Sequence, residues 1–184
     1  MRRGVPGPAY DLSCAGTDRS GRTFCDGGVK VLPAFVWPPQ SWVDIAHQER
    51  RFGVGYPARL PKGGYYTRYW LPEGRWLSIP VRHAQKDTPF LASWPPESRW
   101  RTYHWRTLLT LYGKTPFFYE WKPFLEYLYL EARLPTLQAF CDTILTELAR
   151  LYGWTFYWSE DPPLTLSGPA REPTILAHLL RVGI

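Results

Sequence analysis

Apolar side chains recur every three to four residues in three stretches of the second half of the chain, which predicts three helices. The first covers residues 98–112 and the second 116–130, with a break or restart expected at Pro123 because proline cannot donate a helical hydrogen bond. The third, 136–152, has the most regular apolar stripe and is followed by Gly153. We therefore expect this third helix to lie in the core.

Short runs rich in β-branched and aromatic residues predict about five strands. These runs cover residues 29–37, 51–56, 65–71, 75–81 and 154–159. The first two flank a short helix over 41–48 and form a βαβ-like unit, while a Pro-Glu-Gly turn at 72–74 joins the third and fourth into a hairpin of the same sheet. The sequence thus predicts an α/β single domain, a mixed sheet of about five short strands packed with three to four helices.

The two ends of the chain differ from this central part. Residues 1–28 are rich in Gly, Ser, Arg and Asp without an apolar period, which predicts a disordered N-terminal extension. The α/β domain then covers 29–160, and 161–184 form a Pro-rich tail with a short terminal helix. No apolar run reaches the ~18 residues that a membrane helix requires, and none follows the basic N-terminus. We expect a cytoplasmic protein without membrane insertion.

Positive charge is concentrated in the middle third of the chain. Between Arg59 and Lys114 there are ten basic and three acidic residues, a net charge of +7, whereas the whole chain of 184 residues carries +6. Tyrosines and tryptophans alternate with these charges, which favours a partner with both phosphate groups and a flat ring, as in nucleotides. A solvated basic surface over an aromatic core explains the same pattern, and both interpretations stay open.

Several motifs of well-known enzyme classes are absent from the sequence. It has no phosphate-binding loop ending in Lys-Ser/Thr, no GxGxxG, no GxSxG and no HExxH, so common nucleotide hydrolases, dehydrogenases, α/β-hydrolases and zincins lose support. No two of the four histidines have the i, i+4 spacing, and no two of the three cysteines have a CxxC spacing. We predict no metal site and no cofactor, and we expect Cys141 to be a small core residue.

The helix predicted over 98–112 carries the clearest candidate chemistry. At about 100° per residue, Arg101 lies with the apolar stripe and His104 on its shoulder, whereas Arg106 faces away. A core-facing guanidinium needs an anion or several carbonyls, because burying it unpaired is costly. Arg101 could pair with a nearby carboxylate, or it could form an anion pocket with His104 and Arg68. His104 alone is either a hydrogen-bonded structural histidine or a general base.

Two adjoining segments then resemble a known family. Residues 104–107 (HWRT) and 112–118 (YGKTPFF) are similar to a block of the WbqC-like proteins, a bacterial family linked to gene clusters for surface polysaccharide (O-antigen). Residues 32–46, 62–68 and 77–81 resemble its upstream segments, so the resemblance covers about 30–155. The sequence departs from the family pattern at several positions, with leucine at 32 and threonine at 67 where the family usually has glutamine and asparagine.

The resemblance implies a role in bacterial cell-surface polysaccharide (O-antigen) biosynthesis, with group transfer on an activated sugar nucleotide as the candidate chemistry. On this hypothesis His104 is the general base, and the other site residues contact the sugar nucleotide. The predicted phosphate contacts are Arg68, Arg101, Lys62 and Lys114, and the predicted stacking residues are Trp37 and Tyr65. We expect Arg68, Arg101 and His104 to converge on one cleft. The alternative is a non-enzymatic nucleic-acid-binding module, and whether the chain is an enzyme stays open.

Overall fold

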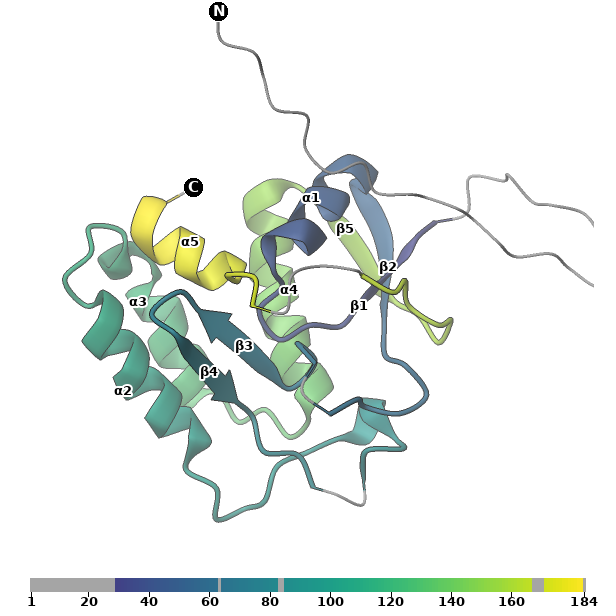
Figure 1. Ribbon diagram of the computed structural model, residues 1–184, viewed down its shortest axis with the longest axis horizontal. Coiled ribbons are helices and arrows are strands. Elements are labelled where there is room, and N and C mark those ends of the chain that lie inside the picture. The colour runs from purple at the N-terminus through teal and green to yellow at the C-terminus, as the bar shows by residue number, and fades with distance from the viewer. Residues whose placement is uncertain (1–28, 63, 83–84, 167–170, 184) are drawn as a thin grey trace, which may run out of the picture.

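The computed structural model describes residues 29–62, 64–82, 85–166 and 171–183, and the extension predicted over 1–28 lies outside them. Within these ranges the chain forms five β-strands and five α-helices (Figure 1), which confirms the α/β class and the number of strands. The strands form two small sheets, one parallel and one antiparallel, instead of joining in one. Among the described residues, no helix has both the length and the apolar character needed to cross a membrane.

A three-stranded parallel sheet is built from both ends of the described chain. Its strands are β1 (Val31–Pro33), β2 (Arg51–Gly55) and β5 (Thr155–Trp158), in the order β1-β2-β5. The pairing is parallel throughout, so the carboxyl ends of all three strands lie at one edge. Helix α1 (Gln40–Glu49) connects β1 to β2 and buries Trp42, Val43 and Ala46. The predicted strand–helix–strand unit at the start of the domain is therefore confirmed.

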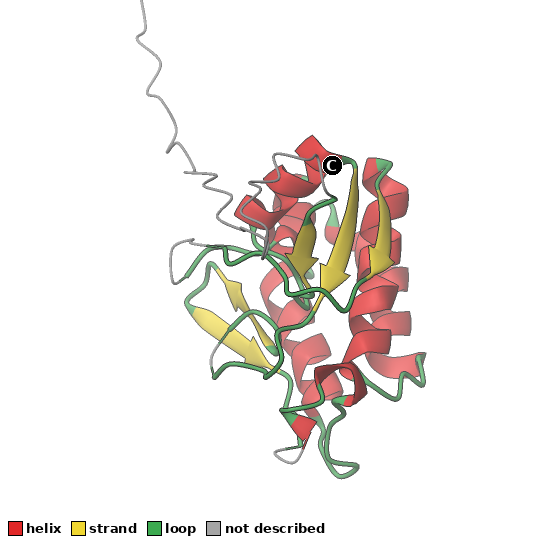
Figure 2. Cartoon of the chain, turned by 90° about the vertical axis from the view of Figure 1, so that its right-hand side faces the viewer, coloured by secondary structure: helices red, strands yellow, loops and turns green. Residues whose placement is uncertain are grey.

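The predicted hairpin forms a separate antiparallel sheet of β3 (Arg68–Leu71) and β4 (Arg75–Ser78). Figure 2 shows it beside the parallel sheet, with most of the helices behind both. The hairpin does not extend the parallel sheet, and on the outer edge of β1 the Leu164 N–H donates to the Val31 carbonyl over 2.8 Å. The tight turn uses Gly74, whose φ of 82° is readily available only to glycine.

The helices form where the apolar periodicity predicts them, with changes at their ends. They are α2 (Trp100–Tyr112), α3 (Phe118–Glu126), α4 (Leu137–Tyr152) and α5 (Ile175–Val182), with short helical turns η2 (Pro89–Leu91) and η3 (Tyr127–Glu131). Helix α3 contains Pro123 and passes into η3, a π-helical turn, so the predicted 116–130 helix has two parts. Helix α4 begins at a Thr136 side chain that accepts from the Ala139 N–H and ends at Gly153, with φ of 68°.

The C-terminal segment packs against the rest of the domain. The Glu172 carboxylate accepts hydrogen bonds from the Ser41 N–H (2.6 Å) and hydroxyl (2.7 Å) at the start of α1, which satisfies free donors of that helix. The Thr174 N–H and hydroxyl lie near the Trp70 carbonyl on the edge of β3. Five residues of α5 are buried. The terminal helix predicted near 174–180 is present as α5, and it forms part of the core.

The core depends strongly on α4, whose apolar stripe is buried from Leu137 to Leu148. Ile144 and Leu148 are both 0 % exposed. We expect Ile144→Ala and Leu148→Ala each to lower the free energy of unfolding by about 2–5 kcal/mol, because each leaves a cavity. Thr146→Ala, on the exposed side of the same helix, serves as the control. Urea midpoints measure the effect, and core variants as stable as the control would contradict this account of the core.

Candidate functional site

Four buried side chains and one backbone carbonyl form a continuous hydrogen-bond chain through the core. The Trp37 indole N–H donates to the Tyr129 hydroxyl (3.0 Å), which lies 2.8 Å from the Tyr69 hydroxyl. Tyr69 in turn lies 3.1 Å from His104 Nδ1, and His104 Nε2 lies 3.2 Å from the Ser78 carbonyl oxygen. All four side chains are at most 1 % exposed. This hydrogen-bond chain therefore joins the segment after β1 to η3, β3, α2 and β4.

The Ser78 carbonyl sets the direction of every bond in this chain. Because a carbonyl oxygen only accepts, His104 Nε2 must carry a proton, and Nδ1 of the neutral ring then accepts from Tyr69. Tyr69 accepts from Tyr129, which accepts from Trp37. Burial lowers the pKa of His104 from 6.5 to about 4, and the bond to Ser78 opposes this shift. The neutral ring is therefore the form that the core holds near neutral pH.

These contacts define the positions of two predicted site residues. Both ring nitrogens of His104 have partners, and its side chain is not exposed, so its contacts are those of a hydrogen-bonded structural histidine. Trp37 is 0 % exposed, and its indole nitrogen is bonded to Tyr129. The roles of His104 as general base and Trp37 as stacking residue stay predictions. Neither side chain contributes to the surface of the protein in this arrangement.

Arg101 lies at the rim of the core among aromatic rings. Its guanidinium carbon is 5.1 Å from the centroid of Trp94, 5.7 Å from Trp100 and 5.9 Å from Phe140. One terminal nitrogen donates to the Ala132 carbonyl, and no carboxylate of the described residues pairs with it. Burial lowers its pKa from the ordinary value. Aromatic faces and a carbonyl thus take the place of the carboxylate that the sequence suggested.

Arg68 and Tyr65 lie on the outer face of the hairpin. The Arg68 guanidinium carbon is 3.9 Å from the centroid of the Trp76 ring, and Tyr65 packs against the same ring at 5.4 Å. The Tyr65 hydroxyl donates to the Glu172 carbonyl and accepts from the Glu172 N–H, each over 2.8 Å. Tyr65 therefore anchors the C-terminal segment, and Arg68 covers an indole face.

The structure does not bring the predicted site residues together. Successive residues of a strand point to opposite faces, so Arg68 points away from the face on which its neighbour Tyr69 reaches His104. Arg101, His104 and Arg68 line neither of two surface hollows in the described part of the chain. The predicted phosphate contacts at positions 62 and 114, Lys62 and Lys114, are exposed and also lie outside these hollows. Contact of these residues with a ligand stays a prediction.

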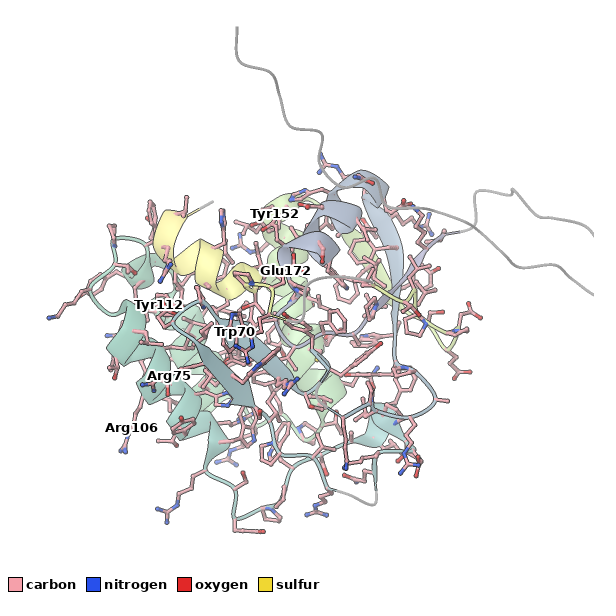
Figure 3. All side chains as sticks on the ribbon, viewed as in Figure 1. Trp70, Arg75, Arg106, Tyr112, Tyr152 and Glu172 are labelled. Carbon is pink, nitrogen blue, oxygen red and sulfur yellow. The ribbon has the colours of Figure 1, made fainter. Side chains whose placement is uncertain are left out.

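A surface hollow of about 290 Å³ lies between the tip of the hairpin and the outer side of α2. We call it the arginine hollow; it is lined by Arg75, Tyr103, Arg106, Thr107, Thr110 and Leu111. Arg75 and Leu71 are paired across the hairpin, so both side chains point to the α2 side. Arg106 comes from the exposed side of α2, and Figure 3 shows both arginines on the same side of the molecule. Two arginine side chains thereby line one hollow.

These two arginines have no acidic partner among the described residues. Glu73, the nearest acidic residue in sequence to Arg75, is engaged by Arg181 and by the Tyr112 hydroxyl. The threonine hydroxyls of the hollow donate to carbonyls one turn earlier in α2. The donors left for a ligand are therefore the two guanidinium groups and the hydroxyl of Tyr103, which is 57 % exposed. Donors of this kind are chemically suited to an anionic ligand.

Sequence reasoning missed Arg75 and Tyr103 and placed Arg106 only as a residue that faces away from the core. The available signal was the helical spacing, since residues 106 and 107 each lie three or four positions from both 103 and 110, which places all four on one side of α2. The contribution of Arg75 depends on how the hairpin packs on α2, and no local pattern indicates that packing.

Within the described part of the chain, neither the buried thiol nor a cluster of acidic and imidazole groups forms an alternative centre. Cys141 is fully buried, accepts from the Tyr56 hydroxyl over 3.6 Å and has its pKa raised to about 12 by burial, so it is a poor nucleophile. No group of three or more His, Cys, Asp or Glu side chains within the described ranges is arranged to hold a metal ion.

Comparison with known proteins gave one match. The family model of the WbqC-like protein family matches residues 61–181, which include all six residues of the arginine hollow. No curated protein and no solved structure matches the chain.

The buried histidine predicts a specific dependence of stability on pH. An unfolded chain protonates His104 below pH 6.5, whereas the folded protein resists protonation down to about pH 4. The contribution of His104 to the free energy of unfolding should therefore be fully present above pH 6.5. It should decrease by about 3 kcal/mol as the pH falls to 4. Urea unfolding measured across this pH range tests the prediction.

The variant His104→Gln separates this effect from the titration of carboxylates. Its amide can donate to Ser78 and accept from Tyr69 but does not titrate, so its stability should change less between pH 6.5 and pH 4. His178→Gln, at an exposed position of α5, should keep the pH dependence of the unchanged protein. Equal pH dependence in all three proteins would show that His104 does not carry the effect.

Proposed function

The chain belongs to the WbqC-like protein family, and on that premise we propose that it binds a phosphate-bearing sugar nucleotide in the arginine hollow during bacterial cell-surface polysaccharide (O-antigen) biosynthesis. One observation carries this proposal: Arg75 and Arg106 line the same hollow without an acidic partner among the described residues. Planar guanidinium groups donate paired hydrogen bonds to phosphate oxygens and keep their charge at any physiological pH. The two together match the charge of a diphosphate.

The other residues of the hollow fit the remainder of such a ligand. The exposed ring of Tyr103 offers a flat surface and a hydroxyl donor, and Leu111 adds an apolar contact. A volume of about 290 Å³ accommodates a diphosphate and an attached ring, with the rest of the ligand lying along the surface. Of the six residues, none is a histidine or a carboxylic acid. The hollow therefore supports binding of the activated sugar more directly than acid–base catalysis on it.

Group transfer is also part of the proposal, but it is assigned to residues predicted from the sequence and not to residues that line the arginine hollow. A role for His104 as general base would require its bonds to Tyr69 and Ser78 to be exchanged for a bond to substrate. Lys114 follows α2 by two residues and is exposed, so it could meet a ligand that extends beyond the hollow.

Titration calorimetry with UDP-glucose, UDP-N-acetylglucosamine, dTDP-glucose and GDP-mannose tests the proposal. We expect at least one of them to bind, and we expect Arg75→Gln and Arg106→Gln each to weaken its binding by about 10- to 100-fold, because each removes charged hydrogen bonds to phosphate. The matched control is Arg99→Gln, which removes the same charge from an exposed position that lies outside the hollow. Loss of binding in the control, or unchanged binding in both hollow variants, would reject the arginine hollow as the site.

The nucleic-acid alternative predicts a different dependence on salt. A protein that neutralises many phosphates along a strand loses affinity steeply as salt increases, whereas one diphosphate in one hollow gives a shallow dependence. A single-stranded oligonucleotide that binds more tightly than every sugar nucleotide, with a steep salt dependence, would replace the proposal with a nucleic-acid-binding function. Single-residue substitutions to glutamine at Arg68, Arg101, Lys62 and Lys114 test the predicted contacts in the same assay.

A further inference from the structure

A second hollow of about 490 Å³ lies where two neighbouring strands of the parallel sheet end. We call it the strand-end hollow; it is lined by Tyr56, Pro57, Ala58, Asp87, Thr88, Pro89, Phe90, Leu91, Glu160 and Pro162. The first three of these residues directly follow β2, and Glu160 and Pro162 closely follow β5. The carboxyl edge of a parallel sheet is where α/β proteins commonly bind their ligands, because the loops that leave the strands diverge there.

One wall of the strand-end hollow is a rigid aromatic group. Tyr56 stacks on Trp158 with ring centroids 5.8 Å apart and an interplanar angle of 15°, and Phe90 meets Tyr56 edge-on at 5.2 Å. The Trp158 indole N–H donates to the Asp142 carboxylate over 2.8 Å, and the Tyr56 hydroxyl donates to Cys141. Because both rings are held from behind, Phe90 and the prolines present a preformed apolar surface.

The polar side of the hollow is fixed by the turn after β5. The Ser159 hydroxyl donates to the Asp161 carboxylate and accepts from the Asp161 N–H, each over 3.1 Å. The turn also sits against Gly55, where an added Cβ would lie only 3.0 Å from the carbonyl oxygens of Ser159 and Asp161. Ser159 and Asp161 are therefore bound to each other, and Glu160 between them is the residue that faces the hollow.

The charges of the lining restrict the kind of ligand. Among the described residues that line the hollow there is no Lys, Arg or His, so a phosphate would meet carboxylates there without a basic lining residue. Asp87 is already paired with Arg59 over 3.1 Å, and Glu160 forms no ion pair with a described residue. Most of the remaining lining is carbon from prolines, aromatic rings and Leu91. A neutral ligand with one apolar face and one edge rich in hydrogen-bond donors would match both the apolar wall and the acidic side of the hollow.

We infer that the strand-end hollow binds an uncharged saccharide. The C–H face of a pyranose ring packs on Phe90 and the prolines, and its hydroxyl groups donate to the Glu160 carboxylate and to the oxygen of Thr88. The site is separate from the arginine hollow, because the two share no residue. The inference therefore does not depend on the proposed function, and each can fail alone.

Saturation-transfer NMR with maltotriose and the methyl glycosides of glucose, galactose, mannose and N-acetylglucosamine tests this inference. We expect at least one saccharide to bind, with little change as salt increases, because a neutral ligand releases no counterions. Glu160→Ala should weaken binding by about tenfold or more, since it removes a charged acceptor. The control Glu131→Ala removes an exposed carboxylate from η3, outside both hollows, and should leave binding unchanged.

Three outcomes would overturn the inference. The first is that no saccharide binds at concentrations up to about 10 mM, since any weaker affinity is too low to count as a site. The second is that Glu160→Ala binds the saccharide as well as Glu131→Ala does, and the third is that putrescine, a cationic probe, binds in the hollow more tightly than every saccharide. The variant Arg106→Gln distinguishes the two sites, since it should weaken sugar-nucleotide binding and leave binding of the neutral saccharide intact. If both ligands respond to Arg106→Gln and neither to Glu160→Ala, only the arginine hollow exists as a site.

Discussion

The hydrogen bond from His104 to the Ser78 carbonyl fixes the donor and the acceptor in every bond of the buried hydrogen-bond chain. A carbonyl accepts but never donates, so this bond fixes the tautomer of His104 and, through it, the donor in each bond back to Trp37. A reversal at any point would leave one buried hydroxyl without an acceptor, which costs about 1–3 kcal/mol. Because its members come from five separate segments, the chain holds the hairpin, η3 and α2 in one relative position.

This arrangement decides which side chains remain available for a ligand. The segment HWRT of α2 is divided by helical geometry: His104 and Trp105 point inward, whereas Arg106 is exposed at the hollow. The aromatic residues that suggested ring stacking with a ligand are also engaged within the protein, since many of them pack against each other or against a guanidinium. Most of the described tyrosines and tryptophans are buried in the core or packed against it, and a few such as Tyr103 are largely exposed.

The arginines of the basic middle region have three different surroundings. Arg101 is enclosed by aromatic rings and a carbonyl, Arg68 covers one indole face, and Arg106 faces a hollow with Arg75. Cation–π contact stabilises an arginine without neutralising it, so the first two keep their charge without a carboxylate. The basic residues behind the net charge of +7 are therefore divided between guanidinium groups packed on aromatic rings and guanidinium groups beside a surface hollow.

The helices could be predicted from the sequence because their signal is local. The stripe of α4, its capping threonine and its terminal glycine all lie within one stretch of the chain. The division into two sheets involves long-range contacts, such as the hydrogen bond between Leu164 and the edge of β1 over 133 positions, that no local pattern encodes. The face of β3 that carries Arg68, opposite to the face on which Tyr69 contacts His104, could not be predicted for a related reason. Residues 65–70 are mostly aromatic, so their alternation does not indicate which side of the strand faces the core, and here it is the side of Tyr69.

The two hollows also differ in how they relate to the family. All residues of the arginine hollow lie within the matched residues 61–181, whereas Tyr56, Pro57 and Ala58 of the strand-end hollow precede them. The arginine hollow is formed by packing the hairpin on α2, and the buried hydrogen-bond chain holds these same elements together. The strand-end hollow depends instead on the close approach of Gly55 to the turn after β5. Each hollow is therefore supported by a different part of the core, so a change that disturbs one need not disturb the other.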